Sequence, residues 1–254
     1  MPEKPPPEPN DLPGVVLYNE DMAPPALLDE WLRERNMVHR TIRTWEEGVP
    51  DDPRDCAWVV ALGASDSATQ REPSWIPDEI AFLGRAVDAD VPVLGICFGG
   101  QALSVALGGV ISLADPISWG WFAIESEEPG LVPRGPWVHF NYEIFSVPAT
   151  ATQVARSPCG PGAFRVGPHL GIQFHPEVSP AIVDAWAESE APKLAELGLT
   201  REDLLAQGEQ FAEDAASQAF ELFDAWRLLA AAPRALSATP GLESGRRRTG
   251  RRRP

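Results

Sequence analysis

Cysteine, histidine and long apolar runs are all scarce in this 254-residue chain. Its three cysteines stand at wide spacing, which does not make a disulfide framework. No apolar run approaches the roughly 20 residues that span a bilayer. The first ten residues lack both the basic and the apolar region of a secretory signal. The sequence therefore predicts a cytoplasmic protein with no membrane contact.

Two of the cysteines have no chemistry-bearing neighbour. Cys56 and Cys159 lack a nearby Cys or His at metal-ligand spacing, so the sequence predicts neither a metal site nor another cofactor. The chain also has no glycine-rich loop of the kind that cradles phosphates. Both cysteines are interpreted as bystanders.

Positive charge is scarce as well. The chain has 21 lysines and arginines against 37 acids, a net charge of −16, which argues against nucleic acid as the main partner because a binding surface must neutralise phosphates. The exception is the run Arg246 to Arg253, which holds six of the 21 basic residues and no acid. We interpret it as a solvated tail. Nonspecific contact with RNA, or with the acidic body of the chain, stays open.

The 44% apolar content suffices for one substantial core. We expect a disordered proline-rich segment at 1–13, one enzymatic domain at 14–195, a helical extension at 196–232 and a disordered basic tail at 233–254.

Strand and helix patterns alternate along the chain, which predicts an α/β fold with a mainly parallel sheet flanked by helices. From Val110 to Gly171 the pattern is choppier and rich in strand residues, as in a sheet extension that carries substrate contacts. The clearest patterns predict strands at 15–18, 57–62 and 91–96, and helices at 25–35, 77–89 and from Cys97 to Leu107, where Gly108 and Gly109 end the helix.

The chain is helical in pattern after Pro180. Apolar residues recur there at three- and four-residue spacing, which predicts an amphipathic helix that packs on its own domain. A helix that docks on a partner is the alternative. The apolar stripe consists of Leu204, Phe211, Ala215, Leu222, Trp226 and Leu229.

The most informative stretch runs from Val91 to Gln101 and ends in Gly-Ile-Cys-Phe-Gly-Gly-Gln. An apolar strand there meets a helix at Cys97, and flanking Gly95 and Gly99 permit a tight, strained turn. Such a turn presents the thiol rather than burying it. The positive end of the helix favours a thiolate and aims backbone N–H groups at any oxyanion that forms beside the sulfur. We therefore predict that Cys97 is a nucleophile.

A second motif, Gly-Ile-Gln-Phe-His-Pro-Glu at residues 171–177, follows another apolar strand. In an extended segment residues two apart share a face, so Glu177 can orient the imidazole of His175 while that ring reaches the thiol. Base and orienter have this relationship in nucleophilic triads.

The two motifs, in this order, resemble those of the class I (triad-type) glutamine amidotransferases, especially the amidotransferase domain of GMP synthase and its stand-alone relatives. The resemblance runs from about Val15 to Trp186. It implies a flavodoxin-like fold in which Cys97 attacks a side-chain amide, His175 transfers the proton, Glu177 orients His175, and water cleaves the resulting thioester.

The same resemblance implies an oxyanion hole made by the amides of Gly63 and Phe98. The loop Leu62-Gly-Ala-Ser-Asp-Ser67 stands where the family has Ser-Gly-Gly-Pro, and only its glycine at 63 is retained. An ordinary turn after a strand is the alternative interpretation of this loop.

Gln101, His139 and Asn141 match the family positions that hold the α-amino and α-carboxylate groups of glutamine. Asn141 is an amide where the family has an acid, so a contact with an ammonium loses its charge assistance. A γ-glutamyl compound with an altered α-amino end would suffer less from that change. His139 and Asn141 could instead satisfy a turn.

The resemblance thus predicts an amidohydrolase that acts on glutamine or a γ-glutamyl small molecule and releases ammonia or an amine. Beyond Trp186 the chain has no room for a synthetase, so a self-sufficient hydrolase is favoured slightly over a glutaminase subunit that serves a synthetase in trans. An ester hydrolase of the dienelactone hydrolase type, the cysteine peptidase and chaperone-like branch of the superfamily, and a non-catalytic subunit are further alternatives.

Overall fold

The computed structural model describes residues 12–231. The predictions for the proline-rich start and for the arginine run from Arg246 to Arg253 fall outside these residues. Among the helices of residues 12–231, none is both long and apolar enough to cross a membrane.

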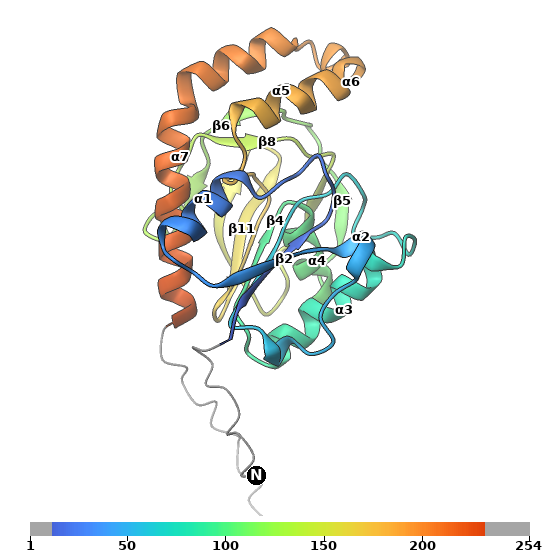
Figure 1. Ribbon diagram of the computed structural model, residues 1–254. Helices are drawn as coiled ribbons and strands as arrows, with labels where there is room; N and C mark the ends of the chain where they lie inside the picture. The colour runs from blue at the N-terminus through green and yellow to red at the C-terminus, as the bar shows by residue number, and fades with distance from the viewer. Residues whose placement is uncertain (1–11, 232–254) are drawn as a thin grey trace, which may run out of the picture.

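One large twisted sheet forms the centre of the molecule (Figure 1). Its first five strands in spatial order run parallel, and the last three continue the sheet in antiparallel fashion. The predicted α/β fold with a mainly parallel sheet is confirmed. In spatial order the strands are β2 (His39–Arg43), β1 (Gly14–Tyr18), β3 (Val59–Ala61), β4 (Val93–Ile96), β12 (His169–Ile172), β11 (Gly160–Val166), β10 (Thr152–Ser157) and β7 (Glu125–Ser126).

The central strands are apolar on both faces because helices cover both sides of the sheet. In β1, Val16 faces the side that carries α1 and α7, whereas Val15 and Leu17 face α3 and α4. The helices are α1 (Ala26–Glu34), α2 (Thr44–Glu47), α3 (Trp75–Asp88), α4 (Phe98–Ala106), α5 (Pro180–Ser189), α6 (Ala191–Glu196) and α7 (Arg201–Ala231), with a short 3₁₀ turn η2 (Pro53–Asp55).

The end of α4 follows from its sequence. The helix stops at Ala106, and Gly108 takes a left-handed conformation with φ of +83°, which residues with a side chain rarely adopt. The predicted stop at Gly108 is therefore confirmed.

Helix α7 packs along the same domain, beside α1 (Figure 1). Leu222 and Trp226 of the predicted stripe are fully covered, and Leu204 and Ala215 are buried as well. Phe211 and Leu229 are partly buried, so the chain itself covers most of the stripe, as expected.

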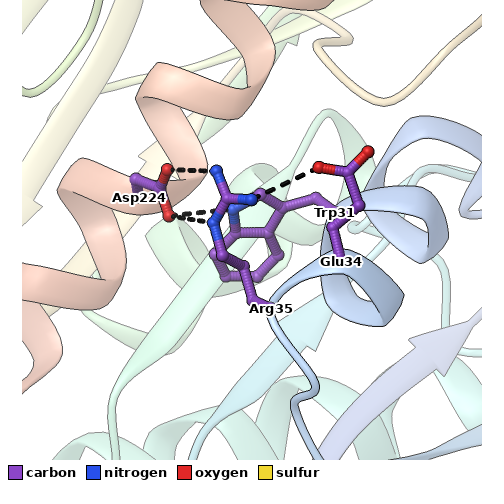
Figure 2. A network of polar contacts seen from close by, with 4 residues as sticks. All are labelled: Trp31, Glu34, Arg35 and Asp224. Carbon is purple, nitrogen blue, oxygen red and sulfur yellow. Dashed lines mark hydrogen bonds and ion pairs between the residues drawn. The ribbon is translucent and has the colours of Figure 1, made fainter.

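A polar contact fixes α7 against α1 (Figure 2). The guanidinium of Arg35 donates to both carboxylate oxygens of Asp224, at 3.0 and 2.7 Å, and the indole N–H of Trp31 donates to Oδ1 at 3.1 Å. The hydrogen bonds from Arg35 are the main reason why the pKa of Asp224 lies below its ordinary value.

The stretch from Val110 to Gly171 adds short strands, as predicted. Besides the edge of the main sheet, it forms two small antiparallel pairs within the described residues. One pair joins β5 (Ile111–Leu113) to β9 (Glu143–Phe145), and the other joins β6 (Gly120–Phe122) to β8 (Trp137–His139).

Candidate active site

Cys97 stands at a sharp turn between β4 and α4. Its φ of 51° and ψ of −108° are strained for a residue with a side chain. The backbone packs tightly there: a Cβ on Gly95 would lie 2.4 Å from the carbonyl oxygen of Gly99, and one on Gly99 would lie 2.1 Å from that of Ala61. Only glycine fits at these two positions, which is what the sequence pattern predicts.

The expectation of a presented rather than buried thiol was wrong. Only 6% of the surface of Cys97 is exposed. The side-chain amide of Gln173 lies 3.9 Å from Sγ, and Gly63 also packs close to the cysteine. Neighbouring segments bury most of the side chain of Cys97, and the part that is left uncovered lines a cavity.

His175 and Glu177 are in contact behind this cysteine. Nδ1 of His175 lies 2.8 Å from Oε1 of Glu177, and both side chains are buried. The segment is not a regular strand; His175 forms an isolated bridge in which its N–H donates to the carbonyl of Val138 at 2.9 Å. The indole of Trp186 packs edge-on against the imidazole, with ring centroids 4.8 Å apart. These contacts fix the ring from several sides.

The charges around His175 favour its protonated form. Burial alone would lower the pKa of the imidazole, but the negative charges of Cys97 and Glu177, together with hydrogen bonds to both, outweigh burial and raise the pKa above its ordinary value. The raised pKa favours an imidazole that holds a proton beside Sγ of Cys97, which is what a base that has accepted the proton of a nucleophilic thiol would do.

Gly63 lies next to both Cys97 and His175. A Cβ placed on Gly63 would sit 3.1 Å from Cε1 of His175 and 3.7 Å from Cβ of Cys97. The amide of Phe98 belongs to the first turn of α4, where amides have no partner within the helix. Gly63 and Phe98 are thus both neighbours of Cys97, and their role as oxyanion donors stays a prediction.

A cavity of about 670 Å³ opens above the thiol. It lies at the carboxyl ends of β1, β3 and β4, the usual place for a ligand in such sheets. Among the predicted residues, Cys97, His175, Gln101 and Asn141 line it. The other lining residues are Glu20, Met22, Ala23, Ala64, Ser65, Asp66, Ser67, Gln70, Leu113, Phe140, Tyr142, Glu143, Trp186, Ser189 and Glu190.

Gln101 and Asn141 come together at one backbone carbonyl. The side-chain amides of both donate to the carbonyl oxygen of Glu143, each at 2.9 Å. Asn141 is 4% exposed, and its Oδ1 has no hydrogen-bond partner in the described residues. A buried acceptor without a partner is costly, so this oxygen is suited to receive an N–H from a ligand.

His139 is not brought to the cavity. Its ring is completely buried between the rings of Phe122 and Phe174, with centroids at 5.8 and 6.0 Å. Within residues 12–231 neither ring nitrogen has a partner. Burial, and secondarily the positive charge of His175, lower the pKa of His139 to about 3. The ring is therefore neutral and packs as part of the core.

Sequence reasoning missed Gln173. Its side chain is fully buried, donates towards Sγ of Cys97 and accepts from the N–H of Phe145 at 3.2 Å. The signal was its place two residues before His175 in the second motif. Across the described chain, no group of three or more His, Cys, Asp or Glu could hold a metal ion.

The chain resembles proteins of one family in sequence. Residues 65–118 match the model of the Peptidase C26 family. The GMP synthase [glutamine-hydrolyzing] of Helicobacter pylori is 27% identical over 159 residues, 60% of this chain and 30% of that protein. The enzyme of the same name from Vibrio vulnificus is 26% identical over 130 residues, 48% of this chain and 24% of that protein. The matched region thus spans less than a third of these relatives.

Solved structures extend the likeness to most of the fold. A glutamine amido transferase from Methylobacillus flagellatus superposes with a TM-score of 0.78 at 22% identity, over 85% of this chain and 94% of that one. A glutamine amidotransferase from Thermotoga maritima gives 0.76 at 21% identity, over 86% and 98%. At these identities the superpositions establish a common fold.

Proposed function

We propose that the chain, as a member of the class I glutamine amidotransferase family, hydrolyses the side-chain amide of glutamine or of a γ-glutamyl compound with Cys97 as nucleophile. One observation carries the proposal: Cys97 and His175 line the same cavity, while Glu177 contacts His175 at 2.8 Å from the buried side.

In the first half of the proposed reaction, Sγ of Cys97 attacks the amide carbon, and the carbonyl oxygen becomes an oxyanion. The amides of Gly63 and Phe98 stabilise this oxyanion. The protonated imidazole of His175 gives its proton to the amide nitrogen, the C–N bond breaks, and ammonia or an amine leaves. A γ-glutamyl thioester remains on Cys97.

In the second half, His175 is neutral and takes a proton from water. The hydroxide attacks the thioester carbon, the C–S bond breaks, and the γ-carboxylate of glutamate is released. Glu177 holds the imidazole in one orientation through both halves, as the acid of a triad does. Gln101 and Asn141 hold the amino-acid end of the substrate.

We propose that this activity is self-sufficient. It resides in a domain of residues 14–195, and residues 196–232 form a helical extension. The protein acts in the cytoplasm, where a free thiol is maintained. The named relatives are GMP synthases that extend well beyond the matched region. A synthetase that acts in trans is the alternative for the fate of ammonia, and turnover by the isolated chain separates the two.

The test is ammonia or amine release from glutamine and a panel of γ-glutamyl amides. We expect turnover by the wild type and a loss of roughly 10³-fold or more in Cys97→Ala. Cys56→Ala and Cys159→Ala are matched controls, because both are also free, buried cysteines but lie outside the cavity. Release by Cys97→Ala at the wild-type rate, or equal losses in the controls, would contradict the proposal.

A further inference from the structure

The cavity is acidic. Four acidic residues line it, Glu20, Asp66, Glu143 and Glu190, and no lysine or arginine does so among the described residues. None of these four makes an ion pair within residues 12–231. A ligand that enters the cavity therefore meets uncompensated negative charge.

The lysine nearest in sequence to this lining is engaged elsewhere. Nζ of Lys193 pairs with Glu196 at 2.9 Å and lies 5.9 Å from the ring centroid of Tyr142, outside the cavity lining. It makes no ion pair with Glu190, whose Oε2 accepts a hydrogen bond from the hydroxyl of Tyr142 at 2.9 Å.

A second observation indicates that the cavity binds a ligand with hydrogen-bond donors. Oδ1 of Asn141, in the same cavity, has no partner although the residue is 4% exposed. The Nδ2 of this amide is held by the carbonyl of Glu143, so the oxygen has a fixed position. The α-ammonium of a γ-glutamyl substrate would satisfy it, which leaves the carboxylates of the cavity for a second positive charge.

The side of the cavity beyond His175 has a distinct character. Trp186 packs on the imidazole. Ser189 is the last residue of α5, and Glu190 is the residue that caps this helix; both line the cavity. Tyr142 and Met22 line the same cavity and are 40% and 44% exposed. Apolar side chains therefore line the cavity between His175 and Glu190.

We propose that the leaving group of the substrate is an alkylamine with a second, positively charged nitrogen, so that the substrate is the γ-glutamyl amide of a diamine or polyamine. This inference rests on the proposed function. The nitrogen that receives the proton of His175 must depart on the His175 side, past Trp186. The methylene chain of the amine lies on this indole, and its ammonium reaches Glu190.

Charge decides between leaving groups of similar shape. An ammonium beside several unpaired carboxylates gains Coulomb energy that an uncharged alkyl end lacks, and a carboxylate end is repelled. Because the cavity is partly open to solvent, salt weakens this preference. An excess of a few kT is enough to separate the three classes by an order of magnitude.

The experiment compares three amides of γ-glutamate with the full-length protein: the amides of 1,4-diaminobutane, of n-pentylamine and of 4-aminobutanoate. These end in an ammonium, a methyl and a carboxylate. We expect kcat/KM to fall by about tenfold or more at each step in that order, and the differences to shrink in 0.5 M NaCl. Equal values, or a preference for the carboxylate amide, would overturn the inference.

The variants locate the charge. Glu190→Gln should lower the ratio of kcat/KM for the diamine amide to that for the pentylamide by about fivefold to tenfold. Glu188→Gln is the matched control two residues earlier, because Glu188 is exposed and does not line the cavity. An unchanged ratio in Glu190→Gln, or an equal fall in Glu188→Gln, would remove Glu190 from the amine site.

Failure of the inference is distinguishable from failure of the proposed function. If the three amides are cleaved equally and the Cys97→Ala variant cleaves none, the hydrolase stands and the cationic leaving group falls. If neither glutamine nor any γ-glutamyl amide is cleaved in a Cys97-dependent manner, both fall.

Discussion

The side-chain amide of Asn19 donates to Oε1 of Glu79 at 3.2 Å, in a place where both side chains are buried. The same amide donates to the carbonyl of Leu62 at 3.0 Å, and the hydroxyl of Thr44 donates to Oδ1 of Asn19 at 2.7 Å. Leu62 directly precedes Gly63, so this network supports the loop beside the nucleophile. Burial raises the pKa of Glu79 to about 8, although the hydrogen bond from Asn19 lowers it in part.

This pKa makes stability depend on pH. Between about pH 4.5 and 8 the unfolded chain ionises Glu79 while the folded chain keeps it protonated, so the folded state binds more protons and the free energy of unfolding falls as pH rises. A shift of this size corresponds to on the order of 5 kcal/mol at most. Glu79→Gln should remove this slope and gain stability relative to the wild type from pH 5 to pH 8.

Urea denaturation at several pH values measures this difference. Asp78→Asn is a suitable control, since Asp78 is the exposed neighbour in the same helix. Parallel pH profiles for the wild type and Glu79→Gln would show that Glu79 is ionised in the folded protein.

The turn at Cys97 predicts a sharp difference between two glycine-to-alanine changes. In Gly99→Ala the new Cβ would lie 2.1 Å from the carbonyl oxygen of Ala61, so the backbone must shift; we expect a loss of several kcal/mol or an insoluble protein. In Gly84→Ala the Cβ meets only the Cβ of Ala106 at 3.8 Å, and a helix interior gains up to about 1 kcal/mol. Thermal unfolding distinguishes the two, and equal melting temperatures would refute the packing argument.

Glu177→Gln tests the orienting acid. The variant keeps the shape of the side chain but loses one of the charges that raise the pKa of His175, so the protonated imidazole becomes less favoured. We expect kcat to fall roughly 10²- to 10⁴-fold with little change in KM. Steady-state kinetics on the best γ-glutamyl amide measures this. A fall of less than twofold would mean that Glu177 has only a structural role.

Asn141→Asp tests the amino-acid end of the site. If Oδ1 of residue 141 faces the α-ammonium of the substrate, a carboxylate restores a charge-assisted hydrogen bond, and KM for free glutamine should fall by about tenfold. Asn141→Ala should raise it instead. If neither change alters KM, Asn141 does not contact the substrate.

Asp224→Asn tests the contact between α1 and α7 in Figure 2. The amide loses the ion pair with Arg35 but can still accept from the Trp31 indole, so we expect a small loss of stability that shrinks at high salt. Because Arg35 lowers the pKa of Asp224, the difference from the wild type should also vanish as pH falls through the pKa of Asp224 in the folded state. A loss of stability that depends on neither salt nor pH would indicate that Asp224 acts through packing rather than through its charge.

Local patterns were enough to predict the elements that surround the nucleophile. The apolar run before Cys97 indicates a buried strand. The glycines on either side of Cys97 indicate that two backbone segments approach closely there, and the structure has this close approach at Gly95 and Gly99. In contrast, β2 was not predicted, because only Ile42 of its five residues is buried. At an edge of the sheet a strand needs no alternation of apolar residues.

Contacts between distant segments could not be read from the sequence. Gln101 and Asn141 meet at the carbonyl of Glu143 only because α4 packs beside β9. Gln173, which follows the end of β12, lies against Sγ of Cys97 and contributes to its burial. The acids of the cavity likewise come from separate segments of the chain, and no local pattern joins them.

The two ends of the main sheet have a consequence for how copies of the protein can associate. Open edges normally invite another chain to add a strand, but β2 carries exposed Arg40 and Arg43, and β7 consists of only two residues. Growth of the sheet from one molecule into the next is thus discouraged at both edges by charge and by brevity. Concentrated preparations should therefore resist fibril-like assembly through these two edges.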